Sequence, residues 1–313
     1  MAVFQATLNQ TAFLLSFILM GYLLSRMKIV PENTQAVLSK LENWVFIPAL
    51  VLGTFISNFN VEKLSSAWAL LLSCIALEVV VIALALVCVR ICTKSKYEQN
   101  IYLYGLCFSN FGFVGNAVVS AIFPEIFLEY LIFTLPLWAL IYVWGVPVLL
   151  MGDAGEKVSI KARLKNFVNP MFICMLLGMV IGLANIPVPA FINSAVTSAG
   201  NCMSPIAMLL TGMTIAKSRL KEILNIKSVY AVSALRLLVF PMLFLAAMLV
   251  IPMQETFAVC ALCSLAMPLG LNTIIIPSAY GKDTRVASGM ALVSHILSCI
   301  TIPVIFLLYN LVK

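Results

Sequence analysis

Ten long apolar stretches alternate with short polar connections along the whole chain. A helix needs roughly 20 apolar residues to cross the ~30 Å hydrocarbon core of a bilayer, and each stretch is long enough to do so. The pattern therefore predicts an all-α membrane protein with ten transmembrane helices. They are expected at 4–24, 35–57, 66–89, 100–122, 127–150, 168–186, 190–216, 229–251, 256–280 and 286–310.

A polar segment divides these spans into two sets of five. The expected organisation is a first five-helix repeat at 1–151, a cytoplasmic connection at 152–167 and a second five-helix repeat at 168–313. The other connections are too short to hold a second, soluble domain.

The composition agrees with the pattern, because 63% of the residues are hydrophobic, only 10% are charged, and the mean hydropathy is +1.09. Soluble domains carry about 25% charged residues. These values exclude an ordinary soluble enzyme, a disordered chain and a nucleic-acid-binding protein. The net charge of +7 is therefore interpreted through its position along the chain.

The basic residues predict the topology. Of 19 Lys and Arg residues, 16 fall in the connections that follow odd-numbered spans, and Lys63 alone falls in an even-numbered connection. Cytoplasmic loops are enriched in Lys and Arg, so the odd connections are expected in the cytoplasm and both termini outside. The N-terminus has no basic region followed by a cleavage site, so we expect no signal peptide and place the protein in the cell membrane.

Five spans per half would give the two halves opposite orientations, as in the inverted repeats of many transporters. Several residue pairs recur at nearly one offset. Pro48 and Pro205 are 157 positions apart, whereas Gly112 and Gly270, like Glu78 and Arg236, are 158 apart. The sequence VPV at 146–148 is followed 156 positions later by IPV at 302–304. These coincidences predict a 5+5 inverted repeat.

The fourth and ninth spans contain residues that interrupt helices. Glycine and proline disfavour helix interiors, and asparagine is costly in lipid unless it is paired. Interrupted helices at matching places in two halves indicate a binding site at the membrane midplane, where free amides can hold an anion. The alternative is close packing by small residues, with asparagine joining the helices. The candidate substrate-binding residues are Asn110, Gly112, Gly115, Asn116, Pro268, Gly270, Asn272 and Thr273.

Two charges and the single histidine lie deep in predicted spans. Glu78 is the candidate carrier of a proton or coupling ion, because intramembrane carboxyl groups usually face a bundle interior or cavity. The alternative is a structural pair with Arg236. Arg236 could instead extend toward the cytoplasmic headgroups or attract a substrate carboxylate. His295 is a candidate proton relay or a hydrogen-bonded packing residue.

Enzyme functions are disfavoured by the same inventory. One histidine cannot build a histidine-rich metal site, both Asp residues lie in loops, and the sequence has no phosphate-binding loop. The nine cysteines lie in or just beside apolar stretches and are interpreted as small hydrophobic residues. We expect no metal site and no cofactor, and the sequence leaves open whether H⁺, Na⁺ or no ion is coupled.

Seven segments together resemble the auxin efflux carrier family, which includes plant PIN-FORMED carriers and bacterial malate or malonate permeases. Their order covers nearly the whole chain. They are FIPALVLGTF (46–55), SNFGFVGNAVV (109–119), NPMFICMLLGMVIGL (169–183), SPIAMLLTGMTIA (204–216), RLLVFP (236–241), AMPLGLNTIIIPSAYG (266–281) and IPV (302–304).

The resemblance implies a ten-span 5+5 repeat, broken crossing helices in spans 4 and 9, elevator-like alternating access and a homodimer. It places Asn110 against a substrate carboxylate, and Glu78 where plant members have an acidic residue. The sequence departs from the plant pattern at Ala117 and Thr273, where those members have prolines at the crossover. It also lacks their long regulatory loop, as in the bacterial branch, so auxin is not implied as the natural substrate.

These observations predict a secondary transporter of small organic anions. The substrate would bind between spans 4 and 9, and Glu78 would change its protonation as the site switches sides. A non-transporting membrane receptor or regulator on the same scaffold is the alternative.

Overall fold

The computed structural model describes residues 2–150, 170–217, 220–279 and 282–313. The regular secondary structure of this part of the chain is helical apart from one isolated β-bridge. Six of its helices are long and apolar enough to cross a membrane, which agrees with an all-α membrane protein. They are Thr34–Asn58, Ala67–Cys92, Pro124–Leu150, Ala190–Lys217, Lys227–Met248 and Arg285–Val312. Shorter apolar helices lie within the other four predicted spans, so the total of ten remains a prediction.

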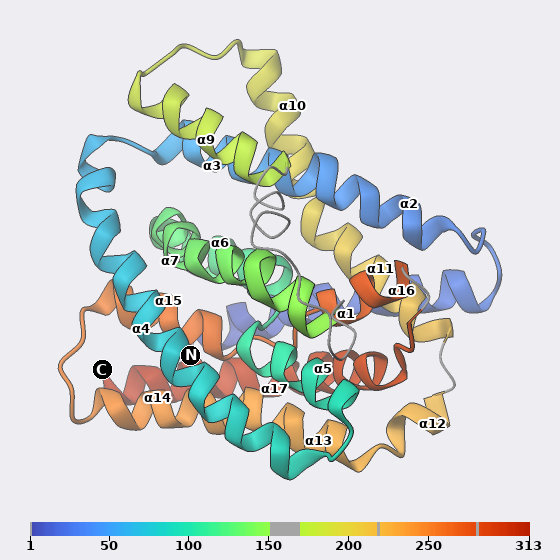
Figure 1. Ribbon diagram of the computed structural model, residues 1–313. Coiled ribbons are helices and arrows are strands. Elements are labelled where there is room, and N and C mark those ends of the chain that lie inside the picture. The colour runs from blue at the N-terminus through green and yellow to red at the C-terminus, as the bar shows by residue number, and fades with distance from the viewer. Residues whose placement is uncertain (1, 151–169, 218–219, 280–281) are drawn as a thin grey trace.

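The helices of the first half are joined by short turns (Figure 1). They are α1 (Ala2–Arg26), α2 (Thr34–Leu41), α3 (Ile47–Asn58), α4 (Val61–Cys92), α5 (Lys96–Cys107), α6 (Asn116–Ile122) and α7 (Phe127–Leu140). Three wider, π-helical segments and one 3₁₀ turn extend or connect them, at Glu42–Phe46, Phe111–Gly115, Ile141–Leu150 and Pro124–Ile126. The predicted connection at 152–167 lies outside the described residues.

The second half contains a similar series. It comprises α9 (Pro170–Leu183), α10 (Ala190–Asn201), α11 (Met203–Lys217), α12 (Leu220–Leu224), α13 (Lys227–Ala234), α14 (Phe240–Met248), α15 (Glu255–Leu265), α16 (Asn272–Ala279) and α17 (Arg285–Val312). A π-helical segment, Leu235–Val239, joins α13 to α14.

Helix ends recur at a constant spacing in the two halves. The ends of α5 and α15, Cys107 and Leu265, are 158 positions apart, and so are the starts of α7 and α17, Phe127 and Arg285. Packing follows the same relation, because α1 packs on α11 and α9 packs on α3. Figure 1 shows α9 beside α3 at one edge of the molecule, with α13, α14 and α17 at the opposite edge.

Glycines allow α1 and α11 to approach closely. A Cβ atom on Gly212 would overlap the carbonyl oxygen of Ile18, and one on Gly21 would overlap the carbonyl oxygen of Leu209. Small residues that let backbones meet are the usual means of helix association in lipid, where burial of apolar surface gives little driving force. The outward faces remain apolar, with Trp44 among the exposed side chains.

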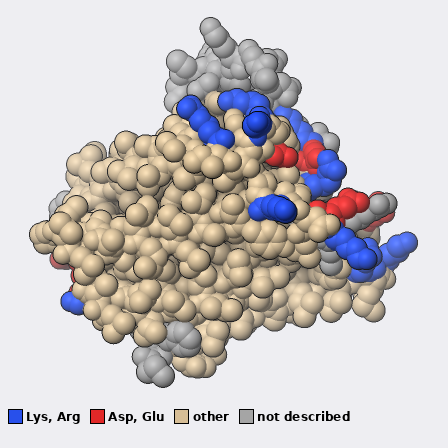
Figure 2. All heavy atoms as spheres, turned by 90° about the horizontal axis from the view of Figure 1, so that it is seen from below, with Lys and Arg blue, Asp and Glu red and all other residues tan. Residues whose placement is uncertain are grey.

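In the described part of the chain, connections that follow odd-numbered spans meet in two pairs. Lys217 donates to the carbonyl oxygen of Glu32, and the Tyr97 hydroxyl donates to that of Asp283 at 2.6 Å. Lys313 after α17 pairs with Glu255 at the start of α15. Figure 2 shows Lys and Arg gathered mainly toward one side, beside a broad surface without charged residues. This distribution suits a protein whose middle is surrounded by lipid.

One ion pair marks the polar end in detail. The Arg285 guanidinium lies 2.7 Å from the Asp283 carboxylate, just before the first turn of α17. Hydrogen bonding from Arg285 holds the pKa of the Asp283 carboxyl below its usual range. Both side chains are well exposed, so this surface ion pair contributes little to the free energy of unfolding.

Candidate functional site at the crossing of two interrupted helices

Two non-helical segments meet inside the protein. Helix α5 ends at Cys107 and the chain becomes helical again at Phe111, whereas α15 ends at Leu265 and α16 begins at Asn272. The backbone N–H of Asn110 donates to the carbonyl oxygen of Pro268 at 2.7 Å, and Ser109 forms an antiparallel bridge with Leu269. The two segments thus satisfy part of each other's backbone where neither is helical.

Glycine is required for this close approach. A Cβ atom on Gly270 would overlap the carbonyl oxygen of Phe108 in the facing segment. On Gly112 it would lie 2.7 Å from Cζ2 of Trp138, and on Gly115 it would meet the hydroxyl of Tyr130. The predicted glycines therefore lie at the contact between the two segments or beside it.

The side chain of Asn110 forms a hydrogen bond inside the helix bundle. Its Nδ2 lies 2.9 Å from Nε2 of His295, and Nδ1 of His295 lies 2.7 Å from the carbonyl oxygen of Ala291. A carbonyl oxygen can only accept a hydrogen bond, so Nδ1 of His295 must donate to Ala291. Nε2 of His295 then accepts a hydrogen bond from Nδ2 of Asn110, which corresponds to a neutral imidazole. Both side chains are buried, and both ring nitrogens of His295 have partners.

Asn272 and Thr273 lie on the other side of the crossing. Asn272 donates to the hydroxyl of Tyr104 at 2.9 Å, and the Thr273 hydroxyl donates to the carbonyl oxygen of Gly270 at 2.7 Å. Asn110, Gly112, Gly270 and Asn272 line one crevice of about 10 Å³, which is room for a single water molecule. The structure thus brings four predicted residues together, around a nearly closed space.

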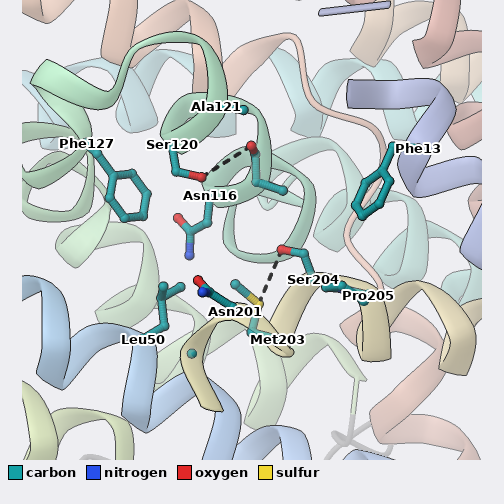
Figure 3. A pocket seen from close by; sticks show the side chains of 12 residues that line it. Phe13, Leu50, Asn116, Ser120, Ala121, Phe127, Asn201, Met203, Ser204 and Pro205 are labelled. Carbon is teal, nitrogen blue, oxygen red and sulfur yellow. Dashed lines mark hydrogen bonds between the residues drawn. The ribbon is translucent and has the colours of Figure 1, made fainter. Parts of the chain in front are cut away.

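Asn116 lines a different and larger cavity of about 270 Å³ (Figure 3). Ser120 of α6, Asn201 at the end of α10 and Ser204 at the start of α11 also line it. In Figure 3 the Asn116 and Asn201 side chains point toward one another. The Oδ1 atom of Asn116 is buried without a hydrogen-bond partner, although buried polar atoms are normally paired.

The cavity residues on α10 and α11 were not predicted. Asn201 stands four positions before Pro205, which is one of the residues that recur at the repeat offset. Asn201 is itself 158 positions after Asn43, so this offset was the one sequence signal that could have pointed to it. The Ser204 hydroxyl donates to the carbonyl oxygen of Phe113 at 2.9 Å. Because this acceptor belongs to the backbone, no sequence motif predicts the contact.

Arg236 lies in the interior and does not extend toward headgroups, since only 1% of it is exposed. Its two terminal nitrogens each donate over 2.6 Å to a carbonyl oxygen, Nη1 to that of Leu106 and Nη2 to that of Ser264. Glu78 on α4 is also buried and interacts electrostatically with Arg236, but its Oε1 has no hydrogen-bond partner.

A third charged residue inside a predicted span is also buried in the protein. Glu42, in the π-helical segment between α2 and α3, is only 1% exposed. It lies seven residues inside the predicted span 35–57, close enough to the span's end to be taken for a boundary residue.

A family profile described as "Membrane transport protein" matches residues 6–306. The chain belongs to this family, the auxin efflux carriers. The resemblance in the sequence is thereby confirmed, and a membrane transporter with a small-molecule substrate is what membership supports. Family membership does not support an enzyme, because the family consists of transporters. A search of curated proteins found no match to the chain.

Proposed function

We propose that this protein is a secondary transporter that carries a small organic anion across the cell membrane by alternating access. The observation that carries the proposal is the 270 Å³ cavity beside Asn116, in a chain whose family transports molecules across membranes. Ligand pockets commonly measure about 300–1,000 Å³, so a cavity of this size favours a small acid over a bulky cargo.

The lining of the cavity suits a carboxylate. Asn116, Asn201 and Ser120 offer amide and hydroxyl donors. Phe13 and Phe127 form apolar walls that would contact a hydrocarbon portion. All the described lining residues are uncharged, so hydrogen bonds would compensate the cargo's charge.

Two groups of helices enclose this cavity, which supports an elevator-like movement. Phe13, Leu50, Asn201 and Ser204 come from α1, α3, α10 and α11, which pack on one another through the pairs α1–α11 and α3–α10. Asn116 and Ser120 come from α6, and Phe127 comes from the start of α7. Sliding of one group past the other would carry the cavity across the bilayer.

The predicted inverted repeat is part of the proposal. The constant spacing of helix ends and the reciprocal packing of α1 on α11 and α9 on α3 support it. The crevice at the crossing is too small for an organic anion, so the expected contacts of Asn110 and Asn272 with the cargo belong to another state of the cycle. Glu78 would change its protonation during the same cycle.

The orientation of the protein in the membrane and its assembly are also part of the proposal. Both termini would lie outside, since the odd connections hold most of the basic residues. A homodimer follows from the family resemblance. A non-transporting receptor is less favoured, because the family consists of transporters.

Two measurements test the proposed function. Purified protein is screened against a panel of mono- and dicarboxylic acids for a rise in thermal stability, because a ligand that binds only the folded state stabilises it. The acids that bind are then used in counterflow uptake into proteoliposomes. We expect at least one acid to stabilise the protein and to be exchanged across the membrane. Binding without exchange would indicate a receptor, and the absence of both would refute an organic anion carrier.

A further inference from the structure

Arg236 joins the ends of two helices that belong to different halves of the chain. The carbonyl oxygens that it binds are those of Leu106, in the last turn of α5, and Ser264, in the last turn of α15. These two residues are 158 positions apart, which is also the spacing between the ends of the two helices. One guanidinium therefore contacts the same position of both halves.

The local sequence leaves both carbonyls without their helical partners. In a continuous helix, Leu106 would accept from the N–H of Asn110, but that N–H donates to Pro268 across the crossing. Ser264 would accept from residue 268, which is a proline and has no N–H. The Ser109 hydroxyl also donates to Ser264, at 2.7 Å, so that carbonyl oxygen receives two bonds from outside its helix.

Two helix ends that meet in this way create a site for a cation. Carbonyl groups in a last turn carry the negative end of the helix dipole. In carriers with discontinuous helices, unwound carbonyls and such helix ends commonly coordinate a coupling Na⁺ or H⁺. Here a buried side chain of the protein itself already occupies the position.

We propose that Arg236 is a fixed cation that replaces a coupling metal ion at the crossing and holds the two helix ends together. The inference rests on the proposed transport function and narrows it, because a carrier with this position filled has no need of Na⁺ there. Arg236 is a positioning residue, since it acts through the backbone of α5 and α15. Glu78, Cys107 and Tyr130 are the titratable groups that interact with it.

The test compares Arg236→Lys and Arg236→Ala with the parent protein. Lysine keeps the charge but lacks the planar fork that reaches two acceptors, and alanine removes both. Ser233→Ala is the matched control, because Ser233 is buried in the preceding turn and its hydroxyl has no hydrogen-bond partner. Thermal stability is measured in detergent extracts with sodium or choline chloride, which needs no cargo, and uptake of an exchanged acid is measured in both salts.

We expect the parent and Ser233→Ala to be equally stable in the two salts. Stability should fall in the order parent, Arg236→Lys, Arg236→Ala, with a loss of about 10 °C for alanine, because removing a buried charge's interactions is costly in proteins. Sodium should restore part of the loss in Arg236→Ala alone, because only there are both carbonyls open. A variant that yields no folded protein ranks lowest in this order.

Three results would overturn the proposal. They are a sodium requirement of the parent for stability or uptake, an Arg236→Ala variant as stable as the parent, and an Arg236→Ala variant that is weakened equally in both salts. The stability readings stand even if no acid is transported, so a failure of the fixed-cation proposal is distinguishable from a failure of the proposed function.

Discussion

Asn110 and His295 are joined by a hydrogen bond of 2.9 Å between Nδ2 and Nε2, although 185 positions separate them in the chain. The bond ties the non-helical segment after α5 to the middle of α17. Because both groups are buried, each would lose its only side-chain partner if the other were removed. The pair thus fixes the crossing to the helix that packs behind it.

Replacing either member of this pair should destabilise the protein by about 1–3 kcal/mol, the cost of leaving a buried polar group unpaired. The double variant Asn110→Ala/His295→Ala should cost less than the two single variants added together. Thermal unfolding of the four proteins gives the coupling energy, which we expect to be about 1 kcal/mol. Strictly additive losses would mean that the hydrogen bond does not contribute to stability.

Asn116→Ala and Asn201→Ala should each weaken uptake of the transported acid. A hydrogen bond to a charged group contributes about 1.5–3 kcal/mol, so we expect a loss of about tenfold or more in affinity. Asn43→Ala is the control, because Asn43 stands 158 positions before Asn201, is exposed and does not line the cavity. Unchanged uptake in both cavity variants, with folding intact, would move the cargo site elsewhere.

Asn272→Ala tests whether the crossing itself contacts the cargo. If the crevice opens during transport, this variant should reduce uptake as Asn110→Ala does, because each would remove an amide donor to the carboxylate. Equilibrium binding of the acid to purified protein should fall in parallel. Intact binding in both variants would exclude the crossing asparagines from the cargo site.

Glu78→Gln should abolish the pH dependence of uptake, since glutamine cannot take up or release a proton. Uptake is measured in proteoliposomes over a range of external pH. Glu42→Gln provides the comparison, because Glu42 is also a buried acid inside a predicted span. Its segment packs against α3, α10 and α11. A Glu78→Gln protein that keeps its pH dependence would remove Glu78 from the coupling step.

Gly212→Ala should loosen the contact between α1 and α11. The added methyl group would overlap the Ile18 carbonyl oxygen, which belongs to the backbone and cannot turn aside. We expect a loss of about 1–3 kcal/mol, the usual cost of overpacking, measured by thermal unfolding. Gly53→Ala is the milder control, because its methyl group would meet only the Val196 side chain at 3.1 Å. Equal stability of the two variants would contradict the described helix contact.

The Asp283–Arg285 pair predicts a small pH effect on stability. Arg285 lowers the pKa of Asp283 in the folded state, so the pair's contribution is present above the unfolded value of 3.8 and is lost as the pH falls through the lower folded value. Arg285→Gln should therefore lower the melting temperature slightly near neutral pH but not in strong acid. A difference that persisted unchanged at low pH would exclude this carboxylate as its source.

The class of protein was predictable from the sequence, whereas the contacts at the site were only partly so. Long apolar stretches require helices in lipid, and glycine, proline and asparagine near residues 110 and 268 indicated where the chain leaves the helix. Asn116 was selected from a polar stretch and lines the larger cavity, but its cavity partners Asn201 and Ser204 were not predicted. They depend on which faces of α6, α10 and α11 meet, and hydropathy does not specify that.

Arg236 shows a second limit. Its position and burial could be suspected from a charge inside an apolar stretch, but its partners are backbone carbonyls, which every residue possesses. Only the loss of helical bonding at Leu106 and Ser264 makes those carbonyls available. The absent N–H of Pro268 is visible in the sequence, whereas the diversion of the Asn110 N–H requires the fold.

The π-helical segments also bear on how the spans tolerate change. Each wide turn contains one more residue than the α-helical turn that it replaces. Removing a single residue from Leu235–Val239 or Phe111–Gly115 would thus restore ordinary winding and leave the side chains beyond it facing as before. The same deletion in an α-helical stretch would rotate every side chain beyond it by about 100°. These short segments are therefore the places where the spans that contain Arg236 and Asn116 tolerate the loss of a residue.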